Sequence, residues 1–199
     1  MKVVVAIPCL DYVPTPFALS LGALMGTKQR DKALRKDIAV TLLHQQGSIL
    51  MDSRNSLVQR AIDVMGTHIF FLDSDMTFPP DTIERLASHH VPFVGTRYVK
   101  RYPPHELLGE PSTGVVRSKP GLQEMDLIPL GVSLTRLDVF HTIPKPWFAY
   151  HTTADASISE DYTFCHKARA AGVTLWNDTL LSPLLGHTGI KTFTQRDTL

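Results

Sequence analysis

Short apolar runs alternate with amphipathic segments along the first half of the chain. Four apolar runs occur, at residues 2–8, 38–43, 68–72 and 91–98. Unbroken runs of this length are typical of strands that are buried on both faces, as in parallel sheets. Helical patterns lie between the runs, at residues 17–25, 52–65 and 79–87. The alternation predicts an α/β fold with three layers and a mostly parallel central sheet.

The second half of the chain has a less regular pattern. Residues 101–121 are rich in proline and are expected to form a surface excursion near the ligand end of the sheet. The elements expected after it are a strand at 127–135 around Gly131, a helix from Ser157 or Ser159 to 171, and a short strand at 173–176. No linker separates the halves, so we expect one domain. Its parts are a first half at 1–98, a second half at 99–189 and a polar tail at 190–199.

Composition and charge narrow the class of protein. The chain has 199 residues, 43% hydrophobic and 20% charged, as in a soluble globular domain that can bury a core. A net charge of +1 gives no global attraction to nucleic acid or membranes, although basic residues gather at 28–36 and 97–101. Cys9 and Cys165 are expected to be reduced and buried thiols, which fits the cytoplasm. The first apolar run is too short for a signal peptide or a membrane span, so we expect no transmembrane segment.

Two carboxylates follow the third apolar run directly, at Asp73 and Asp75. Side chains on an extended strand alternate between faces, so residues two apart can project to the same side at the strand's end. Carboxylate oxygens there suit Mg²⁺ or Mn²⁺ carrying a diphosphate. Open α/β sheets bind their ligands at this edge. The alternative is an ordinary turn rich in Asp and Ser.

Three further polar motifs lie at the ends of expected elements. Glu160 and Asp161 begin an expected helix, where the helix dipole stabilises acidic side chains. The functional alternative is that Asp161 acts as a general base. His187 lies between flexible residues after the last strand and is either a metal ligand or an ordinary surface or core histidine. Ser48 and Arg54 belong to the polar start of a helix, which ordinary capping and surface charge also explain.

The order of these motifs along the chain resembles that of GT-A glycosyltransferases, close to family 2, in their compact bacterial and phage form. The resemblance rests on Ile7-Pro8, Ser48, Arg54-Asn55, Asp73-Ser74-Asp75, Gly131, Glu160-Asp161 and Gly186-His187, and it spans Val3 to about Gly189. It implies a Rossmann-like GT-A fold and transfer of one sugar from a nucleoside-diphosphate sugar to a hydroxyl acceptor, with inversion. The location implied is the cytoplasm, that of the host if the protein is phage-encoded.

The resemblance also implies a role for each half of the chain and for each matching residue. The half at 1–98 would be the nucleotide-binding half, and the half at 99–189 would be the acceptor and catalytic half. It implies that the nucleotide-sugar is bound by Pro8, Asp11, Ser48, Arg54, Asp73, Ser74 and Gly131. A cofactor, Mn²⁺ or Mg²⁺, would be held by Asp75, with His187 and Asp73 as further ligands. Asp161, in the pair with Glu160, would deprotonate the acceptor.

The acceptor side is less defined. Trp147 and Phe148, just before the acidic pair, either stack on an acceptor or anchor a proline-rich turn by packing. Long family 2 enzymes carry a Gln-x-x-Arg-Trp motif after the acidic pair, and its absence here favours a single transfer over polymer synthesis. A glycan, a lipid-linked sugar, a protein and a modified DNA base all remain open as acceptors.

Three other functions share some of these residues. Asp73 and Asp75 also fit the haloacid-dehalogenase-like phosphatases, but there the motif follows the first strand, whereas here two expected strands precede it. A nucleotidyltransferase would carry a glycine-rich basic loop after the first strand, where this chain has Pro8-Cys9-Leu10-Asp11. A nucleotide-sugar-binding module without turnover would bind the donor but not transfer the sugar.

Overall fold

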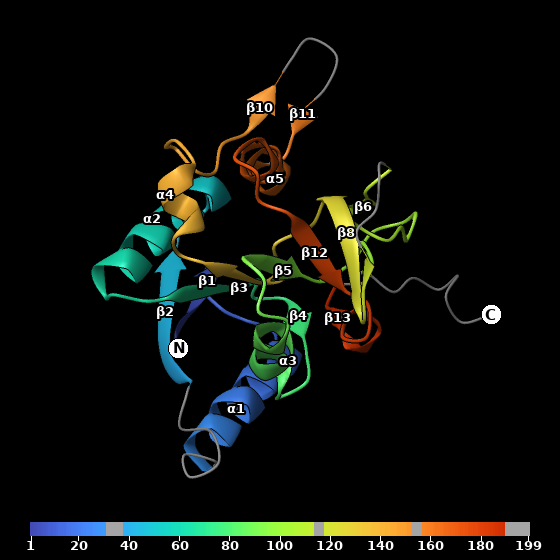
Figure 1. The fold of residues 1–199 in the computed structure, drawn as a ribbon. Coiled ribbons are helices and arrows are strands. Elements are labelled where there is room, and N and C mark those ends of the chain that lie inside the picture. The colour runs from blue at the N-terminus through green and yellow to red at the C-terminus, as the bar shows by residue number, and fades with distance from the viewer. Residues whose placement is uncertain (31–37, 114–117, 153–156, 190–199) are drawn as a thin grey trace, which may run out of the picture.

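The computed structural model describes residues 1–30, 38–113, 118–152 and 157–189 (Figure 1). Nine strands in these residues form the central sheet: β1 (Lys2–Cys9), β2 (Ala39–Gln46), β3 (His68–Leu72), β5 (Phe93–Gly95), β6 (Glu110–Pro111), β7 (Ser118–Lys119), β8 (Leu122–Leu127), β9 (Val132–Arg136) and β12 (Leu175–Asp178). Their order is β2-β1-β3-β9-β5-β12-β8-β6, with β7 also paired to β8.

Most strands of the sheet share one direction. The pairings β1·β2, β1·β3 and β5·β12 are parallel, and β9 lies antiparallel between β3 and β5. β8 is antiparallel to β12, β6 and β7, so β8 and β9 alone oppose the common direction within this sheet. The prediction of a mostly parallel sheet is confirmed. Because β9 comes from the second half of the chain, both halves contribute to one sheet.

Helices cover both faces of the sheet and give the three predicted layers (Figure 1). One face packs against α1 (Thr15–Arg30) and α3 (Thr82–Ser88), and the other against α2 (Leu50–Asp63), α4 (Val139–Thr142) and α5 (Glu160–Ala170). Alternate side chains of β1 pack into the apolar cores on the two faces of the sheet. Val3 and Val5 pack on the α1 side, whereas Val4 and Ala6 pack on the α2 side. All four side chains are fully buried, which explains the unbroken apolar run.

Two small two-stranded sheets lie outside the main sheet. β4 (Met76–Thr77) pairs with β13 (Gly186–His187), which follows the short 3-10 helix η1 (Ser182–Leu184). β10 (His151–Thr152) pairs with β11 (Ser157–Ile158) just before α5. The pairing of β4 with β13 brings the end of the described chain beside the turn that follows β3.

Some elements differ from those expected. The helix expected to stop at Gly26 continues to Arg30, and the strand expected at 91–98 is only Phe93–Gly95. The segment expected as one strand at 127–135 is the end of β8, a turn that contains Gly131, and β9. Most of the basic segment at 28–36 and the tail at 190–199 lie outside the described residues.

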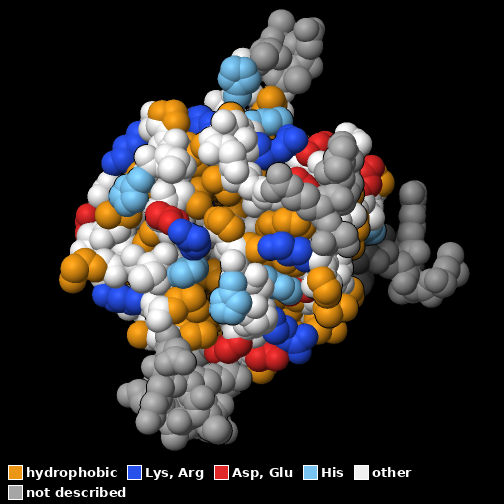
Figure 2. Space-filling model, in the orientation of Figure 1, with side chains coloured by type: hydrophobic (Ala, Val, Ile, Leu, Met, Phe, Trp, Pro, Cys, Tyr) orange, Lys and Arg blue, Asp and Glu red, His pale blue; other side chains and the backbone are white. Residues whose placement is uncertain are grey.

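The surface and the thiols agree with the composition. Cys9 and Cys165 are free thiols, as expected. Cys165 is buried, as predicted, but Cys9, at the end of β1, is only half-buried. Acidic and basic side chains are interspersed on the face shown in Figure 2, in keeping with a near-neutral net charge. Among the described residues, no helix is long and apolar enough to cross a membrane.

Candidate active site

The candidate site lies where the connections out of the sheet diverge. β1 lies between β2 and β3, and the chain reaches β2 through α1 on one face and β3 through α2 on the other. β1 and β2 are neighbours, and the helices that follow them, α1 and α2, lie on opposite faces. This arrangement leaves a crevice beyond the carboxyl ends of β1 and β2, which is where open α/β sheets bind ligands. Asp11 follows β1 and Asp73 follows β3, so both lie at this edge.

A buried arginine joins two acidic residues at the centre of the site. Arg54, in the first turns of α2, donates from Nη1 to Glu160 Oε1 (2.6 Å) and from Nη2 to Asp73 Oδ1 (2.8 Å). The side chains of Arg54 and Glu160 are only 2% and 4% exposed. Burial opposes the charge of Arg54, but Asp73, Glu160 and Asp161 raise its pKa above the ordinary value. Arg54 therefore holds the turn after β3 against the start of α5.

Glu160 is correspondingly committed to this ion pair. Burial raises the pKa of Glu160, and the adjacent Arg54 opposes that shift. Because its carboxylate accepts from Arg54 in the interior, Glu160 supports the structure of the site, and the catalytic role expected for it does not fit this position. The prediction that Arg54 touches the nucleotide is also wrong for this arrangement, since its side chain is buried between two carboxylates.

The turn around Gly131 approaches Asp73 closely. The Asp73 N–H donates to the Gly131 carbonyl (2.9 Å), and the Gly131 N–H donates to the Tyr98 hydroxyl (3.1 Å). A Cβ at Gly131 would lie 2.3 Å from Tyr98 Oη and 3.0 Å from Asp73 Oδ2. Glycine is therefore required for close packing against the candidate site.

Asp75 and His187 meet where β4 pairs with β13. His187 Nε2 lies 3.3 Å from Asp75 Oδ2, and His187 Nδ1 lies 2.9 Å from the Val99 carbonyl. A carbonyl only accepts, so Nδ1 carries the proton and Nε2 faces the carboxylate. The hydrogen bond to Asp75 raises the pKa of His187, against the effect of burial. For Asp75, burial alone would raise the pKa, but His187 and Arg101 lower it overall.

These two side chains fit a divalent cation as two of its ligands. A carboxylate oxygen and an imidazole nitrogen converge, and the second imidazole nitrogen is fixed by a backbone acceptor, as in many metal sites. Among the described residues, no group of three or more His, Cys, Asp or Glu side chains could hold a metal. An ion here would take its other ligands from a bound diphosphate and water.

The expectation that Asp73 shares the cation with Asp75 does not fit the described structure. β3 ends at Leu72, and Asp73, Ser74 and Asp75 form a turn in which the Met76 N–H donates to the Asp73 carbonyl (3.2 Å). Strand alternation therefore stops before the two aspartates. Asp73 binds Arg54, whereas Asp75 contacts His187 and Arg101.

Asp161 lies at the start of α5 with its carboxylate held by local donors. Asp161 Oδ1 accepts from the Tyr162 N–H (2.9 Å) and from the Ser159 hydroxyl. Tyr150 lies just before β10 in the chain and close to the acidic pair, since Glu160 and Asp161 both act on its hydroxyl. Tyr150 is 50% exposed. Burial, then the charge of Glu160 and a hydrogen bond to it, raise the pKa of Tyr150. No sequence pattern pointed to Tyr150 as a residue of the site.

Trp147 and Phe148 are core residues, and the acceptor role expected for them is wrong for this arrangement. They are 4% and 1% exposed. Trp147 Nε1 donates to the Phe140 carbonyl (2.8 Å), and the Phe148 ring packs against Phe71 and Phe164. The Trp147 ring packs edge-on against Phe140, and Lys145 Nζ lies over it, 4.5 Å from the ring centre. Both rings are therefore used in contacts within the protein.

A polar cavity of about 360 Å³ adjoins the carboxyl end of β2 and the start of α2. Its lining includes Ser48, as well as Gln46, whose amide donates to Asp11 Oδ1 (2.6 Å). Pro8 pairs with Gln45 in the register of β1 and β2, so three of the residues expected at the nucleotide lie near one another. Ser74 lies in the turn between Asp73 and Asp75.

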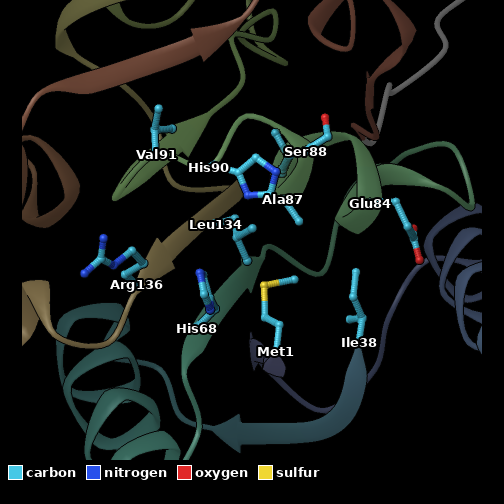
Figure 3. A pocket seen from close by; sticks show the side chains of 11 residues that line it. Met1, Ile38, His68, Glu84, Ala87, Ser88, His90, Val91, Leu134 and Arg136 are labelled. Carbon is cyan, nitrogen blue, oxygen red and sulfur yellow. The ribbon is translucent and has the colours of Figure 1, made fainter. Parts of the chain in front are cut away.

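The cavity shown in Figure 3 is larger, about 570 Å³, but lies at the opposite edge of the sheet. It opens between the amino ends of β1 and β3 and the end of α3, with His68, His90, Leu134 and Arg136 on its walls. None of the candidate site residues lines it. The size of a cavity does not identify the site here, because Asp73, Asp75 and His187 lie at the carboxyl edge.

Comparison with known proteins supports the fold. No family model and no curated protein matches the sequence. The crystal structure of A197 from STIV matches with a TM-score of 0.60 and 15% identity over 96% of this chain and 87% of that one. S. aureus TarS 1–349 matches with a TM-score of 0.48 and 17% identity over 89% of this chain and 58% of that one, a likeness too low to add weight. At these identities the comparison bears on fold alone, and the chain has a GT-A-like three-layer fold.

Proposed function

We propose that this protein is a metal-dependent glycosyltransferase that moves one sugar from a nucleoside-diphosphate sugar to a hydroxyl acceptor, with inversion. The observation that carries the proposal is the contact of Arg54 with both Asp73 and Glu160. This contact holds the turn that bears Asp75 against the helix that bears Asp161. One end of the site can then bind a charged leaving group, and the other can accept a proton.

Each residue of the site has a defined task in this proposal. The polar cavity beside Ser48 and Asp11 takes the nucleoside, and Asp75 with His187 would hold Mn²⁺ or Mg²⁺. When bound, such a cation offsets the negative charge on the leaving diphosphate. Asp161 accepts the proton of the attacking hydroxyl, and Ser159 with the Tyr162 N–H keeps its carboxylate in place. Attack opposite the leaving group inverts the anomeric carbon.

The first test is a thermal-shift screen of nucleoside diphosphates with and without Mn²⁺. A ligand that binds only the native state raises the midpoint of unfolding, so the best stabiliser identifies the donor's base. We expect one diphosphate to stabilise the protein in the presence of Mn²⁺, and Asp75→Ala to abolish this Mn²⁺ dependence. Asp138→Asn is the control, because Asp138 forms an exposed ion pair with Arg136, which lines the opposite-edge cavity.

The second test measures release of that diphosphate from its sugar conjugates. Loss of a general base lowers the rate by about 10²–10⁴-fold. Asp161→Asn should therefore slow release to this extent while the diphosphate stabilises the variant as it does the wild type. Stabilisation without release would identify a binding module, and hydrolysis of an aryl phosphate would favour a phosphatase. A retained anomeric configuration in the product would exclude inversion.

A further inference from the structure

Arg101 contacts the carboxylate that is proposed to bind the cation. Its Nη1 contacts Asp75 Oδ2, the same oxygen that His187 Nε2 approaches at 3.3 Å. A guanidinium and a divalent cation repel each other at such separations, and the repulsion is strong where water is partly excluded. Asp75 cannot serve both at close range, so Arg101 has to move when a cation binds there.

The surroundings of Arg101 permit this movement. Its side chain is 38% exposed and lies 5.1 Å from the centre of the Tyr102 ring. The loop that carries it is closed at its base, where Val99 bridges to Leu107 and the Lys100 N–H donates to the Glu106 carbonyl (2.8 Å). The base of the loop is therefore fixed while the Arg101 side chain is partly in solvent.

Two other arginines near this edge are held differently. Arg97 donates to the carbonyls of Leu108 (3.1 Å) and Gly109 (3.0 Å), and Arg54 is buried between two carboxylates. To bind a ligand, Arg97 or Arg54 would have to give up hydrogen bonds that stabilise the fold. The ion partner of Arg101, Asp75, is half-buried with a side chain 21% exposed. A guanidinium binds phosphate oxygens in a two-pronged geometry that an ammonium cannot match.

We propose that Arg101 exchanges partners during donor binding: it neutralises Asp75 in the free protein and binds the diphosphate once a cation takes Asp75. This inference rests on the proposed function, because it requires a diphosphate at the site. It assigns to Arg101 a binding role separate from the cation ligands, and it explains why a basic side chain contacts a residue suited to a metal.

The test compares Arg101→Ala with the wild type in two titrations by calorimetry. The first uses Mn²⁺ alone, and the second uses uridine or guanosine diphosphate at saturating Mn²⁺. We expect Arg101→Ala to bind Mn²⁺ alone about 2- to 5-fold more tightly, the range for loss of a partly exposed ion pair. We expect the same variant to bind the diphosphate about 3- to 10-fold more weakly, since a charge-assisted hydrogen bond is lost.

The opposite signs of the two effects distinguish partner exchange from mere support of the fold. Arg136→Ala, which removes an exposed ion pair at the other edge, should change neither affinity. Two unchanged affinities in Arg101→Ala, or two that weaken together, would overturn the inference while leaving the proposed function intact. A wild-type protein that binds neither Mn²⁺ nor a diphosphate would overturn both.

Discussion

Replacing Arg54 by methionine removes the cation between Asp73 and Glu160 and keeps an unbranched side chain of similar length. The variant leaves Glu160, with a side chain 4% exposed, as a buried carboxylate without its partner. Removing one member of a buried ion pair costs about 3–5 kcal/mol, because the remaining charge is desolvated without compensation. Asp73 is 25% exposed and is partly hydrated, so we expect the lower part of this range, about 3–4 kcal/mol.

This loss is large compared with the total free energy of unfolding. A domain has about 5–15 kcal/mol in total, and 1 kcal/mol lowers the midpoint of thermal unfolding by about 2–4 °C at this size. The expected decrease for Arg54→Met is therefore about 6–16 °C. Urea denaturation followed by circular dichroism measures the free energy, and calorimetry measures the midpoint. Arg85→Met is the control, because the ion pair of Arg85 with Asp81 is exposed and should contribute less than about 1 kcal/mol.

The pH dependence of the stability of Arg54→Met tests whether the unpaired Glu160 carboxylate causes the loss. Burial raises the pKa of Glu160, and Arg54 opposes the shift, so Arg54→Met raises that pKa further. The native state then binds a proton that the unfolded state, with a Glu pKa of about 4.3, does not bind. Stability of the variant rises as the pH falls through this window, so its deficit should be smaller at pH 5 than at pH 8. The double variant Arg54→Met/Glu160→Gln should recover part of the loss.

Two results would refute this reasoning. An Arg54→Met protein within about 1 kcal/mol of the wild type would show that the ion pair does not hold the two halves of the site together. A deficit independent of pH, with no recovery by Glu160→Gln, would assign the loss to side-chain packing rather than to an unpaired charge.

The other predictions concern close packing around the site. Gly131→Ala places a Cβ 2.3 Å from Tyr98 Oη and should cost about 1–3 kcal/mol in urea denaturation, whereas Gly22→Ala, in a helix with open space, should gain about 0.5–1 kcal/mol. A neutral Gly131→Ala would show that the turn is not closely packed. Phe148→Ala should lower stability by about 3–5 kcal/mol, while Tyr150→Ala, at a half-exposed position, should cost much less. Equal costs would contradict the assignment of Phe148 to the core.

Local sequence patterns identify the buried strands well. The apolar run at 2–8 corresponds to β1, and the run at 68–72 to β3, because strands buried on both faces have no polar face to interrupt the pattern. The helix that passes Gly26 shows the limit of this reasoning. Glycine weakens a helix by about 1 kcal/mol, but burial of Phe17 and Leu24 against the sheet stabilises α1 by more.

The contacts within the site depend on tertiary structure that local patterns do not encode. The sequence points to four residues of the site because each follows or begins an element: Asp73, Asp75, Asp161 and His187. It does not show that Arg54 contacts Glu160, because the two residues are 106 positions apart in the chain. A signal for the burial of Arg54 was present: it shares the spacing of the apolar stripe of α2 at Leu57, Val58 and Ala61. An arginine on the buried face of a helix needs an acidic partner in the interior.

For Asp73 and Asp75, the sequence pattern predicted an arrangement that the structure does not have. The prediction that Asp73 and Asp75 act together assumes that strand geometry continues past Leu72, but the chain turns there. A turn separates the directions of the two side chains. Asp73 therefore belongs to the buried ion pair with Arg54, and Asp75 lies beside His187.

The proposed glycosyl transfer requires that Asp75 and His187 hold a cation that carries a diphosphate. Crystals soaked with Mn²⁺ and the stabilising nucleoside diphosphate would reveal this cation by anomalous scattering from manganese. We expect an anomalous peak within about 2.0–2.3 Å of Asp75 Oδ2 and His187 Nε2, with Arg101 moved away from Asp75. A bound nucleotide with no peak at these two side chains, and Arg101 still in contact with Asp75, would contradict it.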